Sequence, residues 1–407
     1  MSAVAYVPGL HCALYKHQLW HSKSFNPSLA MASVPKLLLV ALLCSYHSVV
    51  AHAADVVSTH KVLDIESMLK PKSVCSESKG IGPSSSVGGT TLPLHHRHGP
   101  CSPVSVSSKK KNMPTLEEML ERDRLRAAYI KRKFNLQAAL GSSVDQQLDA
   151  ATVPTTLGTD ENSLEYVIRV GIGSPAVTQT VLIDTGSDVS WVQCKPCAQC
   201  HNQVDPLFDP SASSTYAPFS CGSGACAQLG QEGAGCSTSS QCQYQVQYGD
   251  GSTTTGTYSA DTLTLGSSTV RNFQFGCSHV ESGFDDLTDG LMGLGGGPQS
   301  LVSQTTGTFG KAFSYCLPAS SDSSSGFLTL GAGTSGGFVK TPLFRTNIPT
   351  FYVVRLQAIR VGGKQLNIPP SVFSAGSIFD SGTVITQLPR AAYSALRSAF
   401  KAGMRQY

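Results

Sequence analysis

The 407-residue sequence contains few charged residues and no uninterrupted apolar run long enough to cross a membrane. Only 14% of its residues are charged and 41% are hydrophobic, so the chain can bury a large core and is globular. Helical periodicity is confined to a few segments, which excludes an all-helical fold. The 39 glycines and 22 prolines, with short apolar runs between turn residues, favour a mostly β fold. No allowed Asn-x-Ser/Thr site occurs, so N-glycans are not expected.

Residues 36–54, KLLLVALLCSYHSVVAHAA, have the layout of a secretory signal peptide: a basic residue, an apolar run, and a small-x-small end at 51–53. The run contains Ser45 and His47 and is too short and polar to favour a bilayer span. We expect no membrane span, cleavage after Ala53, and a translation start at Met31.

Charge is distributed unevenly along the chain. Residues 54–150 have a net charge of +4, whereas residues 151–300 have a net charge of −11. The basic clusters HHRH (95–98), KKK (109–111) and KRK (131–133) could indicate a nucleic-acid or membrane surface. In a secreted chain a solvated, removable prosegment is the better interpretation, so no nucleic-acid partner is expected. The histidine cluster has no second ligand group nearby, so we predict no metal there.

One helix is predicted within this basic segment. Residues 114–134, PTLEEMLERDRLRAAYIKRKF, open with Pro114 and Thr115 and then follow a helical pattern. Its apolar stripe consists of Leu116, Met119, Leu120, Leu125, Ala128 and Tyr129, with the charges elsewhere. The polar text at 142–159 predicts a processing junction.

Nine of the 13 cysteines lie between residues 194 and 316. They are Cys194, Cys197, Cys200, Cys221, Cys226, Cys236, Cys242, Cys277 and Cys316. The first three, in CKPCAQC, could be a zinc knuckle if a fourth ligand were available. In a secreted chain disulfides are the better interpretation, and they would staple a loop-rich insertion at 194–242. Nine is odd, so one cysteine needs a further partner.

Two aspartates occupy duplicated surroundings. The segments YVIRVGIG (166–173) and TVLIDTGS (180–187) predict two strands, the second ending at Asp184. Alone, Asp-Thr-Gly is more often a simple turn. However, SIFDSGT (377–383) places Asp380 after a similar apolar pair, and YVVR (352–355) echoes YVIR (166–169). The chain therefore contains an internal duplication.

Mirrored loops can bring two such carboxylates together. Two like charges that close cannot both ionise, so the pair shares one proton. One carboxylate can then deprotonate a water while its protonated partner polarises a peptide carbonyl. The predicted reaction is peptide hydrolysis, which requires no metal and no other cofactor.

These residues make the sequence similar to the pepsin-like aspartic proteases, and more narrowly to their plant nepenthesin-type branch with its cysteine-rich insertion. The resemblance covers residues 165–407, and PLHHRHGPCSP in the prosegment is also similar. It implies a mostly β, bilobal fold of two duplicated lobes with a cleft between them. The expected regions are a signal region at 1–53, a propeptide at 54–150, an N-terminal lobe at 151–335 and a partial C-terminal lobe at 336–407.

The resemblance also implies roles for individual residues. Asp184 and Asp380 would be the catalytic dyad, supported by Thr185, Gly186, Ser187, Ser381, Gly382 and Thr383. QYGDGS (247–252) matches the flap, so Tyr248, Gly249, Asp250 and Gly251 would cover the substrate, with Trp191 bonded to the tyrosine hydroxyl. Without the motif, Trp191 and Tyr248 could be ordinary core aromatics. DGLMGLG (289–295) would pack under the first loop, and Cys277 would pair with Cys316.

The sequence departs from the family near its end. Asp184 and Gly293 are 109 residues apart, yet only 27 residues follow Asp380. We therefore expect the second lobe to be incomplete and to lack roughly a hundred residues, including the odd cysteine's partner.

Two functions remain open. The first is a secreted acid endopeptidase, made as a monomeric zymogen that binds its own propeptide and peptide substrates, in the cell wall, outside the cell or in the vacuole. The second is a non-catalytic pepsin-fold binding or inhibitor protein.

Overall fold

The computed structural model describes residues 3–6, 12–16, 90–96, 101–103, 115–138, 166–284, 287–317, 326–331, 339–344 and 346–406. The expected signal segment at 36–54 and the expected junction at 142–159 lie outside these residues.

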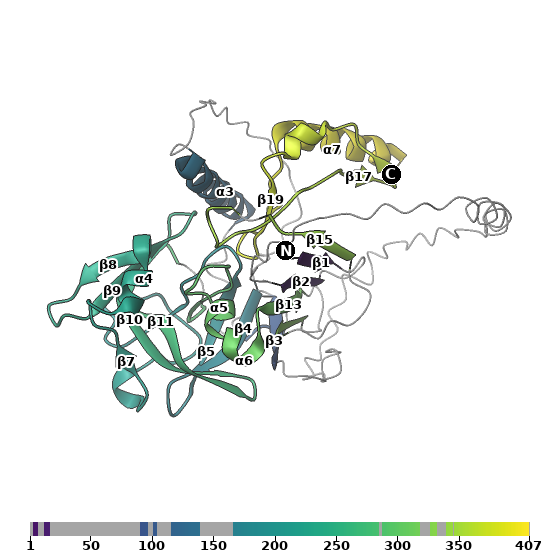
Figure 1. Ribbon diagram of the computed structural model, residues 1–407. Helices are drawn as coiled ribbons and strands as arrows, with labels where there is room; N and C mark the ends of the chain where they lie inside the picture. Colours follow the sequence, from purple (N-terminus) through teal and green to yellow (C-terminus); the bar gives the residue numbers. More distant parts are fainter. Residues whose placement is uncertain are drawn as a thin grey trace, which may run out of the picture. The chain divides into compact units, whose positions relative to one another are not determined.

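Fifteen strands form one mixed sheet, and its long strands β10 and β11 run side by side in Figure 1. The order is β15-β1-β2-β13-β14-β3-β4-β5-β12-β6-β11-β10-β9-β8, with β7 paired to β10. The bounds are β1 Ala3–Tyr6, β2 Cys12–Lys16, β3 Thr90–His96, β4 Tyr166–Ile172, β5 Val177–Asp184, β6 Trp191–Gln193, β7 Ala217–Pro218, β8 Gly233–Cys236, β9 Cys242–Gln247, β10 Thr253–Leu265, β11 Ser268–Ser282, β12 Gly290–Gly293, β13 Ala312–Cys316, β14 Gly326–Leu330 and β15 Val339–Pro342. The prediction of a mostly β fold is thus confirmed.

The remaining elements are short, apart from two helices. Two small sheets pair β16 (Tyr352–Val354) with β19 (Ser377–Phe379) and β17 (Arg360–Val361) with β18 (Lys364–Gln365). The long helices are α3 (Leu116–Ala138) and α7 (Arg390–Gly403). Short helices are α4 (Gly224–Gln228), α5 (Leu301–Gln304), α6 (Thr306–Phe309), η2 (Pro210–Ala212), η3 (Gly230–Glu232), η4 (Pro370–Phe373) and η5 (Met404–Gln406).

The core lies on the strands that lead to the first aspartate. Alternation along β4 and the apolar run of β5 bury Ile168, Val181 and Ile183, which are at most 2% exposed. They pack with Phe273 and Phe275 of β11. Burial of apolar surface stabilises the folded state by about 25 cal/mol per Å². Displacing β5 would expose these side chains, so the cluster holds the end of β5, and with it Asp184, in place.

Strand β12 supports the first loop, as the DGLMGLG segment predicts. It lies between β5 and β6, parallel to the former, with Gly293 opposite Asp184. The N–H of Leu294 donates to the carbonyl of Asp184 at 2.7 Å. A Cβ on Gly290 would lie 2.0 Å from the carbonyl oxygen of Trp191, so only glycine permits this strand spacing.

The two aspartates follow antiparallel strand pairs of equal register. In the β4–β5 pair Val167 faces Leu182, two residues before Asp184. In the β16–β19 pair Val353 faces Ile378, two residues before Asp380. The sequence echo between these segments therefore extends to their pairing, which presents both aspartates in the same way.

Strand β3 corrects one expectation about the basic segment. HHRH was expected to be solvated, but His96 is only 3% exposed and Leu92 and Leu94 are in the core. Strand β3 pairs with β14 through residues 90–94 and with the start of β4 through His95 and His96. Alternation of apolar Leu92 and Leu94 with exposed neighbours is the strand signal that the basic cluster obscured.

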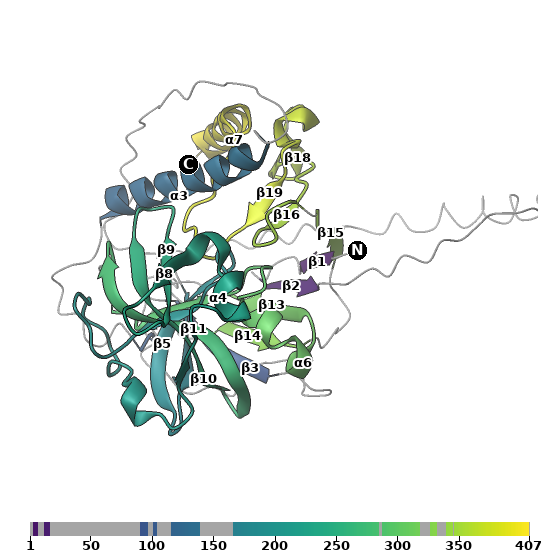
Figure 2. The ribbon, with the colours of Figure 1, turned by 60° about the vertical axis from the view of Figure 1, so that its left-hand side comes forward.

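Helix α3 extends beyond the predicted 114–134. Thr115 caps it, because its Oγ1 accepts from the N–H of Glu118 at 3.2 Å while the Glu118 carboxylate accepts from the Thr115 N–H at 2.7 Å. Met119 of the predicted stripe is buried, but Leu120 is 39% exposed. Figure 2 shows α3 between the β8–β9 hairpin and β19.

Helix α7 confirms the helix predicted at 390–404, with its last residue in η5. Its N-terminal region buries Ala392, whereas Tyr393 and Phe400 are 44% and 58% exposed. Among the described residues, no helix is both long and apolar enough to cross a bilayer.

Disulfides link most of the nine cysteines. Cys194 bonds to Cys277, Cys197 to Cys200, Cys221 to Cys236, and Cys226 to Cys242. The predicted Cys277–Cys316 pair is wrong. Strand β11 lies beside β6, which leads into Cys194, whereas β13 lies between β2 and β14. Cys316 is itself disulfide-bonded within the chain, so its partner is not in a segment beyond residue 407.

Candidate active site

The two aspartates have matching local contacts. Asp184 accepts from the Gly186 N–H at 2.9 Å and from the Ser187 hydroxyl at 2.7 Å. Asp380 accepts from the Gly382 N–H at 3.1 Å and from the Thr383 hydroxyl at 2.6 Å. Each carboxylate is thus oriented by the turn that follows it.

Thr185 and Ser381 tie the two loops together. The Thr185 N–H donates to Ser381 Oγ at 3.0 Å, and the Ser381 N–H donates to Thr185 Oγ1 at 2.9 Å. Both hydroxyls also donate to main-chain carbonyls across the pair, those of Phe379 and Ile183. This reciprocal set is buried, which makes it costly to break.

Each aspartate is followed, two residues later, by a glycine that the packing of the site requires. A Cβ on Gly186 would lie 2.6 Å from Asp380 Oδ1, and a Cβ on Gly382 would lie 2.6 Å from Asp184 Oδ1. The opposing carboxylate therefore occupies the space that a side chain would need.

Arg126 of α3 lies across both aspartates. Its Nη2 donates to Asp184 Oδ1 at 2.7 Å and to Asp380 Oδ1 at 2.9 Å, and its Nε donates to Asp380 Oδ2 at 2.7 Å. All three side chains are nearly buried, with 13%, 2% and 6% of their surface exposed. Sequence reasoning missed this residue, because the prosegment basic residues were treated as a group.

The two carboxyl groups differ in acidity. Burial raises the pKa of Asp184 and outweighs the attraction of Arg126, while the charge of Asp380 raises it further. For Asp380 burial is again the largest effect, but the charge and hydrogen bond of Arg126, with Thr383, leave its pKa lowered. Two neighbouring carboxyl groups whose pKa values are shifted in opposite directions hold one proton between them.

Asp123 is a second missed residue. It lies three residues before Arg126 on α3 and is 2% exposed. Its carboxylate accepts from the main-chain N–H groups of Val384 at 3.1 Å and Ile385 at 2.5 Å. Burial raises its pKa, and the two N–H groups, which lower it, only partly offset this.

The predicted flap residues form the turn between β9 and β10. The Trp191 indole N–H donates to the Tyr248 hydroxyl at 2.7 Å, and both side chains are buried. Asp250 accepts from the Ser252 N–H and hydroxyl at 3.0 and 2.6 Å. Gly251 has a φ of 96°, which suits the tight tip.

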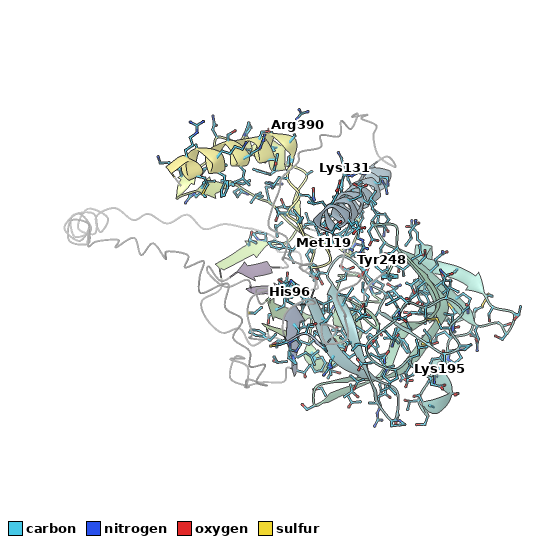
Figure 3. The ribbon with its side chains drawn as sticks, turned by 180° about the vertical axis from the view of Figure 1, so that it is seen from behind. His96, Met119, Lys131, Lys195, Tyr248 and Arg390 are labelled. Carbon is cyan, nitrogen blue, oxygen red and sulfur yellow. A yellow bond between two sulfur atoms is a disulfide. The ribbon has the colours of Figure 1, made fainter. Side chains whose placement is uncertain are left out.

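A small cavity remains between α3 and the cleft. Its volume is about 70 Å³ and its lining includes Met119, Asp184, Tyr248 and Gly382. Figure 3 labels Met119 on α3 and Tyr248 at the flap turn. Residues from helix α3, the first aspartate loop, the turn between β9 and β10 and the second aspartate loop therefore meet at one place.

No group of three potential metal ligands occurs within the part of the chain that the structure describes. The cysteines of CKPCAQC bond to one another and to Cys277.

Several known proteins and protein families are similar to this chain. Family models described as "Xylanase inhibitor N-terminal" and "Xylanase inhibitor C-terminal" match residues 166–332 and 351–407. Among solved structures, soybean basic 7S globulin has a TM-score of 0.46 and 20% identity, covering 60% of this chain and 67% of that one.

Three plant relatives are similar over most of their length. An aspartyl protease family protein of Arabidopsis thaliana is 40% identical over 84% of this chain and 72% of its own. Aspartyl protease AED1 of Arabidopsis thaliana is 37% identical over 88% and 75%, and nepenthesin-2 of Nepenthes gracilis is 36% identical over 79% and 72%. The chain therefore belongs to the plant nepenthesin-type family of aspartic proteases.

Proposed function

We propose that the protein is a secreted aspartic endopeptidase that is made as a zymogen. The observation that carries the proposal is the Asp184–Asp380 pair, whose carboxylates share the guanidinium of Arg126. Equal registers of the two antiparallel strand pairs and the Thr185–Ser381 bonds support a two-lobed site, with an N-terminal lobe at 151–335 and a C-terminal part at 336–407.

In this mechanism the carboxyl groups act as one acid–base unit on a bound water. The ionised member takes a proton from the water, and the protonated member donates to the carbonyl oxygen of the scissile peptide. The water oxygen forms the new bond to the carbonyl carbon. The carboxyl group that took the water proton then donates it to the amide nitrogen while the other carboxylate takes a proton back from a hydroxyl of the tetrahedral species, and the C–N bond breaks to release the amine and the new carboxyl group. Ser187 and Thr383 hold the outer oxygens, so the inner ones face the substrate.

In the full-length chain Arg126 occupies the place of the water and the substrate. Its positive charge opposes the effect of burial on the pKa of both aspartates, and leaves that of Asp184 raised and that of Asp380 lowered, so docking of Arg126 favours ionised carboxylates. By linkage, docking weakens as acid protonates them. We expect release of α3 in acid, followed by cleavage between Phe134 and Thr159.

The second candidate function is a non-catalytic binding or inhibitor protein. The descriptions of the two matching family models as xylanase inhibitor domains favour it. Pepstatin, an inhibitor that mimics the tetrahedral species, separates the two candidates. Tight binding at about pH 4 requires the paired carboxyl groups in a formed cleft, and no binding would favour the second.

The full-length chain tests the proposal directly. After incubation at about pH 4, where carboxyl groups titrate, mass spectrometry should show loss of the prosegment. Asp184→Asn and Asp380→Asn should each abolish this cleavage, because an amide can neither take nor share the proton. Retained self-cleavage in either variant would remove that residue from the catalytic pair.

A further inference from the structure

The main-chain N–H groups of Val384 and Ile385 form a small binding site beside the aspartates. They follow Thr383 of the second loop and donate to the two oxygens of one carboxylate, that of Asp123. Two adjacent N–H groups directed at one anion are a recurring way for proteins to bind negative charge.

The occupant belongs to a segment that the proposed function removes. Asp123 is on α3, 261 and 262 residues from its two partners. Within the described residues, no main-chain carbonyl accepts from either N–H. When α3 leaves, both N–H groups therefore lose this acceptor and need a new one.

The site lies at a defined distance from the reacting centre. Asp123 and Arg126 are separated by three residues of helix, an axial rise of about 4.5 Å. An extended peptide advances about 3.3 Å per residue. A substrate side chain that reaches the amide pair therefore belongs to a residue within about two positions of the scissile bond.

We propose that the Val384–Ile385 amide pair is a carboxylate-binding subsite. Asp123 fills it in the full-length chain, and an acidic side chain of a peptide substrate fills it after the prosegment leaves; this second part rests on the proposed function. A carboxylate satisfies both N–H groups with two equivalent oxygens. An amide presents one oxygen and one NH₂ group, and the NH₂ group opposes the second N–H.

Nearby charges moderate the preference. Asp380 raises the pKa of Asp123 by repulsion, whereas Arg126 lowers it. A substrate carboxylate would meet the charge of the aspartate pair without Arg126. The preference for a carboxylate over an amide side chain must therefore come from the two N–H groups. This preference should weaken when the substrate carboxyl group is protonated.

The first experiment needs no catalysis. In full-length Asp123→Ala the amide pair is empty, and acetate should fill it at about pH 6, where acetate is ionised. Titration followed by amide NMR should shift Val384 and Ile385, with acetate binding about tenfold tighter than acetamide. The wild-type chain, whose site is filled, should show no such shift.

Equal responses to acetate and acetamide, or none at these two amides, would overturn the subsite. Asp123→Ser provides the same empty site if the alanine variant does not fold. Neither result depends on peptidase activity, so failure here is distinct from failure of the proposed function.

The second experiment uses the acid-processed wild-type protein. Paired peptides that differ only by Asp or Asn within two positions of the scissile bond should differ about fivefold or more in kcat/KM near pH 5, with Asp preferred. The ratio should fall towards one near pH 3, where the substrate carboxyl is largely protonated. A ratio of one at both pH values would show that the site accepts a neutral carbonyl equally well.

Discussion

At the scale of single residues, Arg126 joins the two aspartates of the candidate site. One planar guanidinium donates three bonds to two buried carboxylates, a geometry that lysine cannot reproduce. It places a fixed positive charge between the two carboxyl groups. On the proposed function the contact is inhibitory, and it is sensitive to protonation of its partners.

Replacement of Arg126 should move the pH at which the prosegment is released. Arg126→Ala loses the charge that favours ionised aspartates, so half-processing in a fixed time should occur about one pH unit or more higher. Arg126→Lys should lie between the two. Arg124→Ala is the matched control, because Arg124 is 61% exposed and pairs only locally with Glu121. Equal midpoints for Arg126→Ala and wild type would contradict the role of the guanidinium.

The Trp191–Tyr248 contact should contribute measurably to stability. Tyr248→Phe leaves the buried indole N–H without its acceptor at 2.7 Å, which costs about 1–3 kcal/mol of the free energy of unfolding. Chemical denaturation at neutral pH measures it. The exposed Tyr393→Phe is the control, and a loss no larger than in this control would show that the bond is dispensable.

Residues that belong to short sequence motifs could be predicted from the sequence. Residues whose role depends on the packing of α3 against the two aspartate loops could not. Asp184, Asp380, Trp191 and Tyr248 stand in short segments whose neighbours predict their contacts. Nothing local distinguishes Arg126 from the other basic residues of α3. The available signal was that Asp123 and Arg126, three residues apart, share one helix face with apolar Met119.

At the scale of elements, α3 lies directly against the flap. A Cβ on Gly249 would lie 2.5 Å from the Cα of Arg126. The main chain of Gly249 lies against the main chain of Arg126. A side chain added at residue 249 would therefore clash with backbone, which a change of rotamer cannot relieve. The flap glycine is required by the docked helix.

Gly249→Ala should therefore weaken prosegment docking. We expect acid processing to be complete at a higher pH than in wild type, with hydrogen exchange of α3 amides increased at neutral pH. Gly307→Ala, where a Cβ meets nothing within 4 Å, is the control. Unchanged α3 exchange in Gly249→Ala would show that the helix docks elsewhere.

Helices and strands with a regular spacing of apolar residues could be predicted from the sequence, whereas the pairing between strands could not. The strands at 166–173 and 180–187 and the helix at 390–404 follow from spacing of apolar residues. Strand β3 was hidden because three histidines and an arginine suggested solvation, although Leu92 and Leu94 alternate. The Cys277–Cys316 error arose because sequence shows strands but not which strands are neighbours.

At the scale of the whole molecule, a second carboxyl pair suits the protein to acid. Asp289 lies next to Asp205, and burial together with that neighbour raises its pKa to about 8. Asp289 also accepts from the main-chain N–H of Thr180 at 2.5 Å, and the Thr180 hydroxyl donates to Asp205 at 2.6 Å. These bonds anchor the start of the segment that carries Asp184.

The sign of this effect is fixed by the raised pKa. A group that holds its proton more tightly when folded stabilises the folded state in acid, and this stability is lost as pH rises towards 8. One such group reduces the free energy of unfolding by up to about 1.4 kcal/mol per pH unit across that range. This carboxyl group should therefore contribute more to the stability of the folded state near pH 5 than near pH 8.

Asp205→Asn should flatten this dependence. The asparagine can donate an N–H to Asp289 and still accept from Thr180, so no proton need be shared. Thermal unfolding at about pH 5 and pH 8 should differ less in the variant than in wild type. Asp209→Asn, at an exposed pair with Lys195, should change nothing. An equal or steeper dependence in Asp205→Asn would contradict the contribution of Asp205 to the raised pKa of Asp289.

The most direct test of the account is the pH dependence of peptide cleavage by the acid-processed protein. If Asp184 and Asp380 share one proton, kcat/KM should follow a bell with two apparent pKa values that belong to the pair. Single replacement of either aspartate by asparagine should reduce cleavage by at least about a thousandfold. A profile that keeps its shape and height in either variant would contradict the claim that the two carboxyl groups act as one.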